Sequence, residues 1–405
     1  MEHLSADMSA PRPTRSATAR ARTQARRRRI LATGAAVLTL AALAVAGVAA
    51  GLSVRAGAAA TLTRARTPRP APLPSLDASS ALSHASRPAT LTVAAVGDMI
   101  FDRRVASLIA SSGGRAPLSR VASLLSEADI TVGNLESPLS SRGSRNLEKD
   151  VTFRGDPRGV EGLAAAGFDF LSLANNHVLD YGPDALADTV ALLDQHGIGH
   201  AGASADRSAA WRPAAAERNG ARVAFLSFSH ILPAGFVATD SKAGLARGRG
   251  NMDAVCEAIR QAKSENDYVI VSFHWGVEYQ DDCNAEQVRD AHAAIDAGAD
   301  MVLSHHPHVI QAVERYKGRL IAYSLGDFVF DHYSRKTGEA FVLQAELGPD
   351  GVGAVRIVPV YLDTNGRPEV VSGEAARVIL DRLRAISAKR GTTVVLRGDE
   401  AEVAP

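Results

Sequence analysis

Cysteine is scarce in this chain of 405 residues, which has only Cys256 and Cys283. Neither lies at the end of a predicted strand, so a zinc site built from thiolates is excluded. Aromatic residues make up only 5% of the chain, and no basic stripe with interleaved aromatics follows the N-terminal region. We therefore expect no nucleic-acid partner. An oxidising compartment would permit a disulfide between the two cysteines, and two unpaired thiols are the alternative.

Charge is absent from Ile30–Val54, an apolar run of 25 residues that is long enough to cross a bilayer. Residues 1–29 hold eight arginines against two acidic residues, a net charge of +6, and end in four consecutive arginines. The positive-inside rule keeps this basic tail in the cytoplasm. We expect residues 30–54 to form a single-pass transmembrane signal anchor with an extracytoplasmic domain behind it. Secretion after cleavage near residues 56–60, or a buried Ala-rich helix, is the alternative.

Residues 55–90 have the composition of a spacer. Four prolines lie within Thr67–Ser75, and serine and alanine dominate the residues that follow. Such a segment favours an extended, disordered linker that would hold a domain away from the membrane. Behind it we expect a main domain at 91–345 and a C-terminal extension at 346–405 that packs on it. Gly373–Pro405 has the pattern of one amphipathic helix and a short strand.

Short β-branched and apolar runs recur through the main domain, and each has the length of a buried strand. They are Leu91–Asp98, Ala128–Glu136, Phe168–His177, Ala221–His230, Asp267–Gly276, Ala299–His308 and Arg319–Phe328. Helical periodicity appears between them at Pro183–Gly197 and Asn284–Ala299. Strands that alternate with helices predict an α/β domain.

Polar residues gather where these strands end. They are Asp98, Asn134, Glu136, Asn175, Asn176, His177, His274, His306, His308 and Asp327. Ligands bind at the carboxyl ends of the strands in open α/β sheets. Carboxylate, amide and imidazole groups together suit one or two divalent ions of the Mn²⁺, Zn²⁺ or Fe²⁺ type.

The segment LSHHPHVIQ, residues 303–311, places three histidines in four positions. His306 and His308 lie two apart and would face one cavity from an extended segment, with Pro307 stiffening the chain between them. His305 would point elsewhere and support or pack against the site. We expect His196 and His292, which lie in predicted helices, to be ordinary surface histidines.

Several long motifs resemble those of CapA-like proteins, in the same order. They are VGDMIFDRRV, VGNLESPL, GFDFLSLANNHVLDYG, GIGHAGA, VSFHWGVEY, LSHHPHVIQAVE and YSLGDFVFD. The resemblance covers about residues 91–331. That family is associated with poly-γ-glutamate capsule synthesis and export and resembles calcineurin-like metallophosphoesterases. It implies a four-layer αββα sandwich.

The resemblance also implies roles for individual residues. Metal ligands would be Asp98, Glu136, Asn176, His274, His306 and His308, with Glu136 standing where a metal-bridging aspartate is usual. His177 would be the general acid, and Glu136 would share the catalytic centre. Substrate-side positions would be Asn134, Asn175, His305 and Asp327.

Two positions depart from the family pattern. The usual Asp-x-His motif is Asp98-Met99-Ile100 here, so one ligand is missing or is replaced by Glu136 or Asn134. Asp327 replaces an asparagine, and its extra negative charge would strengthen cation binding or weaken binding of an anionic substrate.

The sequence therefore predicts a membrane-anchored, metal-dependent protein that acts in capsule polymer synthesis or export. If it is catalytic, it would be a hydrolase of an anionic polymer or peptide. A non-catalytic polymer-binding or assembly subunit of a capsule synthase is the alternative. A metal-dependent peptide-modifying enzyme is a further, minor alternative.

Overall fold

The computed structural model describes residues 88–405. The expected basic tail, transmembrane anchor and most of the linker fall in residues 1–87 and lie outside the described part. Within residues 88–405, no helix is both long enough and apolar enough to cross a membrane.

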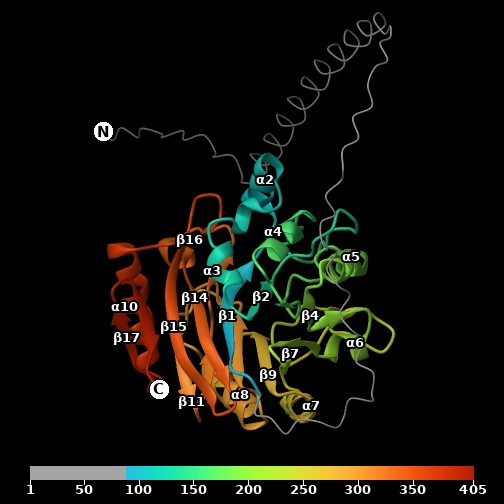
Figure 1. Cartoon of the computed structure of the whole chain (residues 1–405). Helices are drawn as coiled ribbons and strands as arrows, with labels where there is room; N and C mark the ends of the chain where they lie inside the picture. Colours follow the sequence, from blue (N-terminus) through green and yellow to red (C-terminus); the bar gives the residue numbers. More distant parts are fainter. Residues whose placement is uncertain (1–87) are drawn as a thin grey trace, which may run out of the picture. The chain divides into compact units, whose positions relative to one another are not determined.

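The larger of two main sheets has the strand order β17-β18-β15-β14-β1-β2-β3-β4, with β13 paired to β1 and β16 paired to β15 (Figure 1). Its strands are β1 (Leu91–Met99), β2 (Ile130–Leu135), β3 (Phe170–Ser172), β4 (Gly199–Ala201), β13 (Asp327–Val329), β14 (Glu339–Gly348), β15 (Gly351–Leu362), β16 (Pro368–Val370), β17 (Val394–Arg397) and β18 (Glu400–Val403). Strands β1 to β4 are parallel, and β14 runs antiparallel to β1. The carboxyl ends of β1, β2 and β3 therefore meet at one edge.

The second sheet has the order β11-β12-β10-β9-β7-β6. Its strands are β6 (Ala214–Arg218), β7 (Ala221–Ser229), β9 (Tyr268–His274), β10 (Met301–His305), β11 (Val313–Tyr316) and β12 (Arg319–Ala322). Strands β7, β9, β10 and β12 are parallel, so their carboxyl ends also share an edge. A small separate pair consists of β5 (Ala203–Ser204) and β8 (Gly244–Leu245).

The two main sheets pack face to face, as the side chains that point alternately to the two sides of β1 show. Val93 and Ala95 belong to the core shared with the second sheet, whereas Ala94 and Val96 face the core beneath the helices that follow β1. Across the sheet interface, Phe170 stacks on Phe225 with ring centroids 5.6 Å apart.

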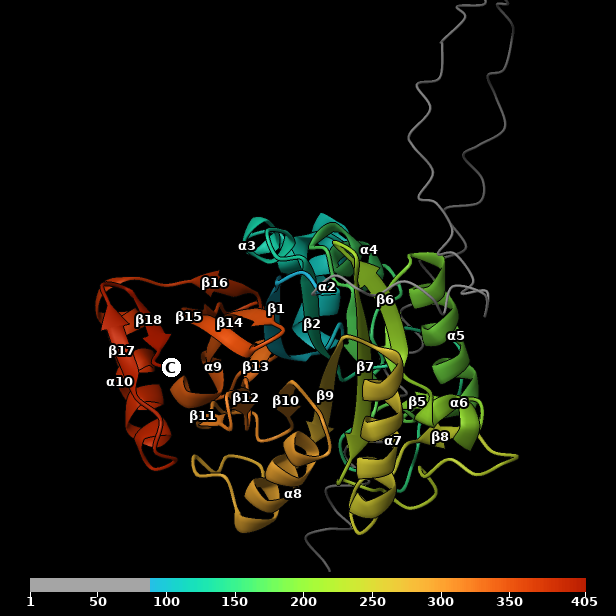
Figure 2. The same ribbon diagram turned by 60° about the horizontal axis from the view of Figure 1, so that its bottom comes forward.

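Helices cover the outer faces of the two sheets (Figures 1 and 2). Helices α2 to α5 pack on the larger sheet, and α7 and α8 pack on the second. The helical segments are α2 (Arg103–Ser112), η1 (Ala116–Leu118), α3 (Ala122–Ser126), α4 (Gly159–Ala165), α5 (Gly182–Gln195), α6 (Arg207–Trp211), α7 (Met252–Glu265), α8 (Ala285–Asp296), α9 (Arg335–Gly338) and α10 (Gly373–Ala388). The predicted α/β class is confirmed.

Local sequence signals account for the two expected helices. Pro183 lies in the first turn of α5, where its missing N–H has no intrahelical partner to lose. Asn284 caps α8, accepting a hydrogen bond from the Gln287 backbone N–H while the Gln287 side chain accepts one from the Asn284 N–H.

Three details differ from the expectations. The run Arg319–Phe328 is not one strand, because Gly326 has a φ of 75° and the chain turns between β12 in one sheet and β13 in the other. The C-terminal segment holds α10 and a hairpin of two strands, β17 and β18, rather than one strand. The expected domain boundary after residue 345 falls inside β14, which pairs along most of its length with β15.

Both cysteines are free. Cys256 lies on α7, where its Sγ is 3.6 Å from the carbonyl oxygen of Ala293, and Cys283 lies just before α8. The disulfide that an oxidising compartment would permit is therefore not present.

Candidate metal centre

Strand ends from both sheets meet at the candidate metal centre. Asp98 of β1 is paired in register with Asn134 of β2 on one side and with Asp327 of β13 on the other. In the second sheet, His274 of β9 is paired with His305 of β10. The face-to-face packing of the sheets brings these residues together, so each sheet supplies part of one buried polar cluster.

Two glycines allow β1 and β13 to approach closely beside Asp98. A Cβ atom on Gly97 would lie 1.8 Å from the carbonyl oxygen of Gly326, which accepts a hydrogen bond from the Asp98 N–H at 2.9 Å. Any side chain at position 97 would push the strands apart. The sequence Gly-Asp thus places Asp98 and Asp327 side by side.

Donors surround both oxygens of the buried Asp98 carboxylate. Asn134 Nδ2 donates to Oδ1 at 2.7 Å, and the His306 backbone N–H donates to Oδ2 at 3.0 Å. His305 Nδ1 lies 3.4 Å from Oδ1, so His305 lines the cluster after all and does not point away from it. Asn175 Nδ2 in turn donates to Asn134 Oδ1 at 3.1 Å. The two asparagines therefore orient the carboxylate from behind.

His274, Glu136 and Asn176 form the deepest part of the cluster. His274 Nε2 lies 2.7 Å from Asn176 Oδ1 and 3.5 Å from Glu136 Oε1. Glu136 and His274 are completely buried. Burial, followed by the nearby Asp98 carboxylate, raises the pKa of Glu136 well above its ordinary value. Like charges held in a dry site favour a proton or a cation between them.

The backbone of the histidine motif differs from the extended segment that the sequence suggested. His306 has a φ of 98° and His308 a φ of 55°, so the chain turns sharply here. Left-handed backbone at non-glycine residues is typical of functional sites that the surrounding structure holds in place. The two side chains still face the same space, with ring centroids 5.8 Å apart. His308 Nδ1 lies 2.8 Å from Asp327 Oδ1.

The cluster has the chemistry of a cation site. Three overlapping sets of ligand atoms each lie within 4.8 Å of one another: Glu136, His306 and His308; Asp98, His308 and Asp327; and Asp98, Glu136 and His274. Three buried atoms in it have no hydrogen-bond partner: Glu136 Oε1, His305 Nδ1 and His306 Nδ1. Buried polar atoms are normally satisfied, and a metal ion would satisfy atoms such as these.

The protonation states of His274 and His306 also fit metal binding. Burial lowers the pKa of His306 to about 3, and burial together with the neighbouring histidines lowers that of His274 well below its ordinary value. Both rings are therefore neutral at pH 7, which is the form that ligates metals. The acidic and histidine groups present could hold a metal ion.

His177 has partners that the sequence analysis missed. Its Nδ1 lies 2.6 Å from Asp180 Oδ2 and 3.2 Å from Lys149 Nζ. Lys149 also forms an ion pair with Asp180 and donates to the backbone oxygen of Asn176. Lys149 lies in a polar loop that reads as solvent-exposed, and Asp180 lies three residues beyond His177 within the ANNHVLDYG motif.

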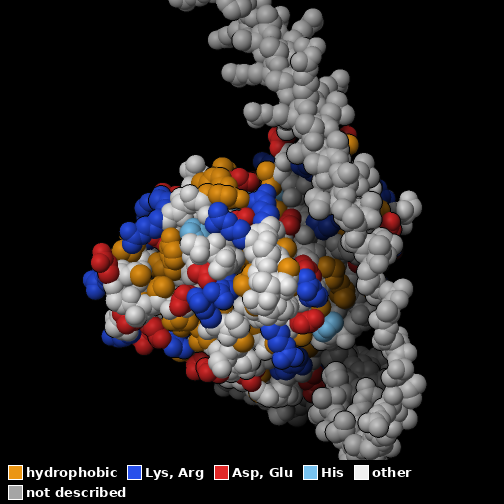
Figure 3. Space-filling view, turned by 90° about the horizontal axis from the view of Figure 1, so that it is seen from above, with side chains coloured by type: hydrophobic (Ala, Val, Ile, Leu, Met, Phe, Trp, Pro, Cys, Tyr) orange, Lys and Arg blue, Asp and Glu red, His pale blue; other side chains and the backbone are white. Residues whose placement is uncertain are grey.

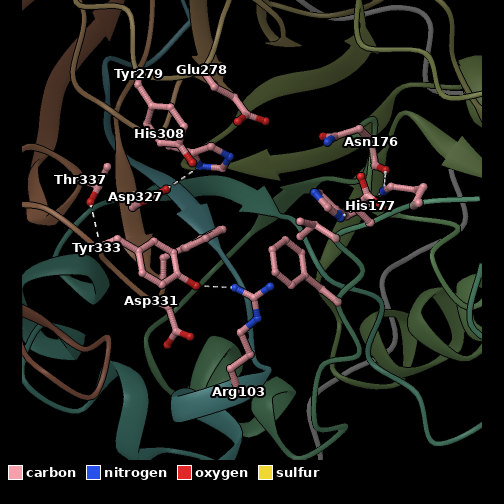
Figure 4. Close-up of a pocket in the computed structure, with 15 residues that line it drawn as sticks. Arg103, Asn176, His177, Glu278, Tyr279, His308, Asp327, Asp331, Tyr333 and Thr337 are labelled. Atoms are coloured by element: carbon pink, nitrogen blue, oxygen red, sulfur yellow. Dashed lines mark hydrogen bonds and ion pairs between the residues drawn. The ribbon is translucent and has the colours of Figure 1, made fainter. Parts of the chain in front are cut away.

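A cavity of about 430 Å³ opens beside this cluster. In Figure 4, Asn176 and His177 lie on one side of it, and Tyr279, His308 and Asp327 lie on the other. Arg103 and Lys149 supply positive charge to its wall, and acidic residues including Glu278 and Asp331 supply negative charge. On the face in Figure 3, basic and acidic side chains are interspersed rather than segregated.

The structure thus brings together every expected site residue. His196 and His292 lie elsewhere: His292 stacks on Tyr316, with ring centroids 3.8 Å apart, and His196 caps the end of α5.

Comparisons with known proteins agree with the motifs. Residues 92–332 match the family described as "Bacterial capsule synthesis protein PGA_cap". "Capsule biosynthesis protein CapA" of Bacillus anthracis is 30% identical over 320 residues, which cover 77% of each chain. "PGA biosynthesis protein CapA" of Bacillus subtilis (strain 168) is 31% identical over 272 residues, 67% of this chain and 71% of that protein. A probable polyglutamine synthesis accessory protein of Mycobacterium tuberculosis is 35% identical over 222 residues, 53% of this chain and 58% of that protein. The family match spans more than half of the chain, and the chain therefore belongs to the PGA_cap family of bacterial capsule synthesis proteins.

Proposed function

We propose that this protein is a metal-dependent component of poly-γ-glutamate capsule synthesis or export. The names of the two Bacillus relatives support this role. We further propose that the apolar run Ile30–Val54 anchors the chain in the membrane and that the domain works outside the cytoplasm, beside capsule synthase subunits.

The observation that carries the metal-dependent part of the proposal is the buried cluster of Asp98, Glu136, His274, His306 and His308. Its unpaired atoms, the neutral imidazoles of His274 and His306, and its clustered carboxylates suit one or two Mn²⁺, Zn²⁺ or Fe²⁺ ions. The sandwich of two sheets between helices is also the arrangement expected of a metallophosphoesterase-like fold. A bound divalent ion would polarise the scissile centre and lower the pKa of a water molecule.

His177 is the residue best placed to move a proton. It lines the cavity, and burial lowers its pKa to about 4, so the ring is neutral at pH 7. A proton on Nδ1 is held by the carboxylate of Asp180 at 2.6 Å. Nε2 is then free to accept a proton from the attacking water and to return it to the leaving group, as a general base and then a general acid.

The wall of the cavity carries both positively and negatively charged side chains. Arg103 would bind carboxylates of poly-γ-glutamate, whereas Glu278 and Asp327 limit how much negative charge can enter. Phe153 covers His177, with the ring centroids 4.2 Å apart, and restricts water access to this imidazole.

The test uses the purified full-length chain and its metal content after dialysis. His274→Ala should lose about one equivalent of bound metal relative to the wild-type chain, whereas His292→Ala, which removes an imidazole far from the cluster, should not. Equal metal content in His274→Ala and the wild-type chain would contradict the assignment. Turnover of poly-γ-glutamate that disappears in His177→Ala would support a hydrolase.

A non-catalytic polymer-binding subunit is the second candidate, and the first motif favours it. In the Asp-x-His pattern of the superfamily, the histidine would stand at the position of Ile100. Met99 and Ile100 are both fully buried among apolar side chains. No ligand can come from these positions. Polymer binding by wild-type and His177→Ala chains alike, without turnover, would support this candidate.

A further inference from the structure

His230 is a buried histidine that the site described above does not use. It follows β7 directly, and its backbone N–H donates to the carbonyl oxygen of His274 at 2.9 Å. Its side chain is 3% exposed, and neither ring nitrogen has a hydrogen-bond partner. Leaving polar atoms of a buried ring unsatisfied is unfavourable, and a ligand at one of the two ring nitrogens would remove part of this cost.

The His230 ring lies on the opposite side of the second sheet from the candidate metal centre. Neighbouring residues of a strand point to opposite faces, and His274 faces Glu136 and Asn176. Phe273 and Trp275, on either side of His274, face the other way and stack on each other, with ring centroids 4.5 Å apart. The His230 ring contacts both of them edge-on, at 5.5 and 5.6 Å.

Helix α8 supplies two carboxylates to this buried imidazole. Glu286 and Asp290 lie four residues apart, on one face of α8, which packs against β10 (Figure 2). His230 Nδ1 is 3.9 Å from Asp290 Oδ2, and one ligand atom from each of the three residues lies within 4.8 Å of the others. Asp290 is 2% exposed.

Of the two ring nitrogens of His230, Nδ1 faces the carboxylates, because the backbone at Gly248 lies against Nε2. On the other side of the ring, a Cβ atom at Gly248 would lie 2.9 Å from His230 Nε2, so the chain closes over that edge. Arg249 and Arg289 reach the outer sides of Glu286 and Asp290, at 3.4 and 2.8 Å. The arginines hold the two carboxylates in place without reaching the imidazole.

We propose that His230, Glu286 and Asp290 form a second divalent-cation site, of the Zn²⁺ class, separate from the main cluster. One neutral imidazole and two carboxylates are a suitable donor set for such an ion. Ligand atoms around tetrahedral zinc lie about 3.4 Å apart, so the His230–Asp290 pair, 3.9 Å apart, would have to close by about half an ångström. The pairs that include Glu286 lie within 4.8 Å and would have to close by at most about 1.4 Å.

The expected role of this site is structural. A bound ion would tie the first turns of α8 to the end of β7, directly behind the strand that presents His274. The proposal does not depend on the proposed function, because none of its three ligands lines the cavity beside His177.

The test uses the full-length chain with His274→Ala, which removes a ligand of the main cluster. Added Zn²⁺ should still bind to this variant in equilibrium dialysis and raise its melting temperature. Adding Glu286→Gln should weaken Zn²⁺ binding at least about tenfold and remove the thermal shift. Glu257→Gln removes the same charge from the exposed surface of α7 and serves as the matched control.

Two results would overturn the proposal: a His274→Ala chain that binds no Zn²⁺, or Zn²⁺ binding by the Glu286→Gln variant as tight as in the control. Failure of the main centre gives a different result, since His274→Ala alone would then hold as much metal as the wild-type chain. Asp290→Asn provides a second ligand variant, and it should behave like Glu286→Gln.

Discussion

The ion pair between Lys149 and Asp180 offers a quantitative test of how the His177 side of the site is built. The Asp180 side chain is fully buried and that of Lys149 is 16% exposed. Replacing Lys149 with methionine keeps most of the side-chain volume but leaves the Asp180 carboxylate without its cation. Breaking a buried ion pair in this way costs about 3–5 kcal/mol.

The structure places Lys149→Met at the lower end of that range. Asp180 Oδ2 keeps two partners, the backbone N–H of Phe153 at 2.8 Å and His177 Nδ1 at 2.6 Å. We therefore expect the free energy of unfolding to fall by about 3 kcal/mol. The double variant Lys149→Met/Asp180→Asn removes both charges, and its loss should be smaller than the sum of the single losses by about 2 kcal/mol.

Urea unfolding of the full-length chain, followed by circular dichroism, measures these differences as long as the slope with urea is unchanged. Lys317→Met is the matched control, because Lys317 pairs with Asp296 at the exposed surface and should show no measurable loss. A loss below about 1 kcal/mol for Lys149→Met, or strictly additive losses in the double variant, would refute the reasoning.

Three further changes test other parts of the structure. Gly97→Ala would place a Cβ atom 1.8 Å from the Gly326 carbonyl oxygen, and it should lower the free energy of unfolding in urea by about 3 kcal/mol or more. The control is Gly220→Ala: Gly220 has a φ of 80° but open space around it, so the loss should be about 1 kcal/mol. Burial raises the pKa of the Cys283 thiol to about 11, so its thiolate fraction at pH 8 is roughly 200-fold below that of a free cysteine. Labelling of Cys283 with a disulfide reagent should be correspondingly slow until urea unfolds the chain. Equal labelling rates in the folded and unfolded chain would show that the Cys283 thiol is not buried. Asp327→Asn should weaken divalent-cation binding by roughly 10- to 100-fold and strengthen poly-γ-glutamate binding in titration calorimetry, and unchanged affinities would contradict a role for this carboxylate at the site.

The strand ends were predictable because each depends on a short local pattern. A β-branched apolar run followed by Gly-Asp or Asn-His identifies Asp98 and His177 without knowledge of their neighbours in space. The α/β class follows from the same runs, since helical periodicity separates them. Capping residues such as Asn284 also mark helix starts from sequence alone.

Features set by long-range packing were not predictable in this way. Lys149 reads as a surface lysine, and only the fold brings it to Asp180, 31 positions along the chain. The left-handed backbone of His306 is fixed by contacts such as its N–H donating to Asp98, because sequence patterns predict extended or helical backbone but not strain. His230 stood at a predicted strand end, but its carboxylate partners lie on a helix more than 50 positions away.

The hydrogen bond between the Asp98 carboxylate and the His306 backbone joins residues 208 positions apart. We expect such a contact to form late in folding, because a long loop has to close before it can be made. We therefore expect the complete pocket to form only once nearly the whole domain has been assembled, because a chain that ends before His306 lacks His306, His308 and Asp327. Any metal ion held by all of these groups would then be acquired by the folded domain rather than by the nascent chain.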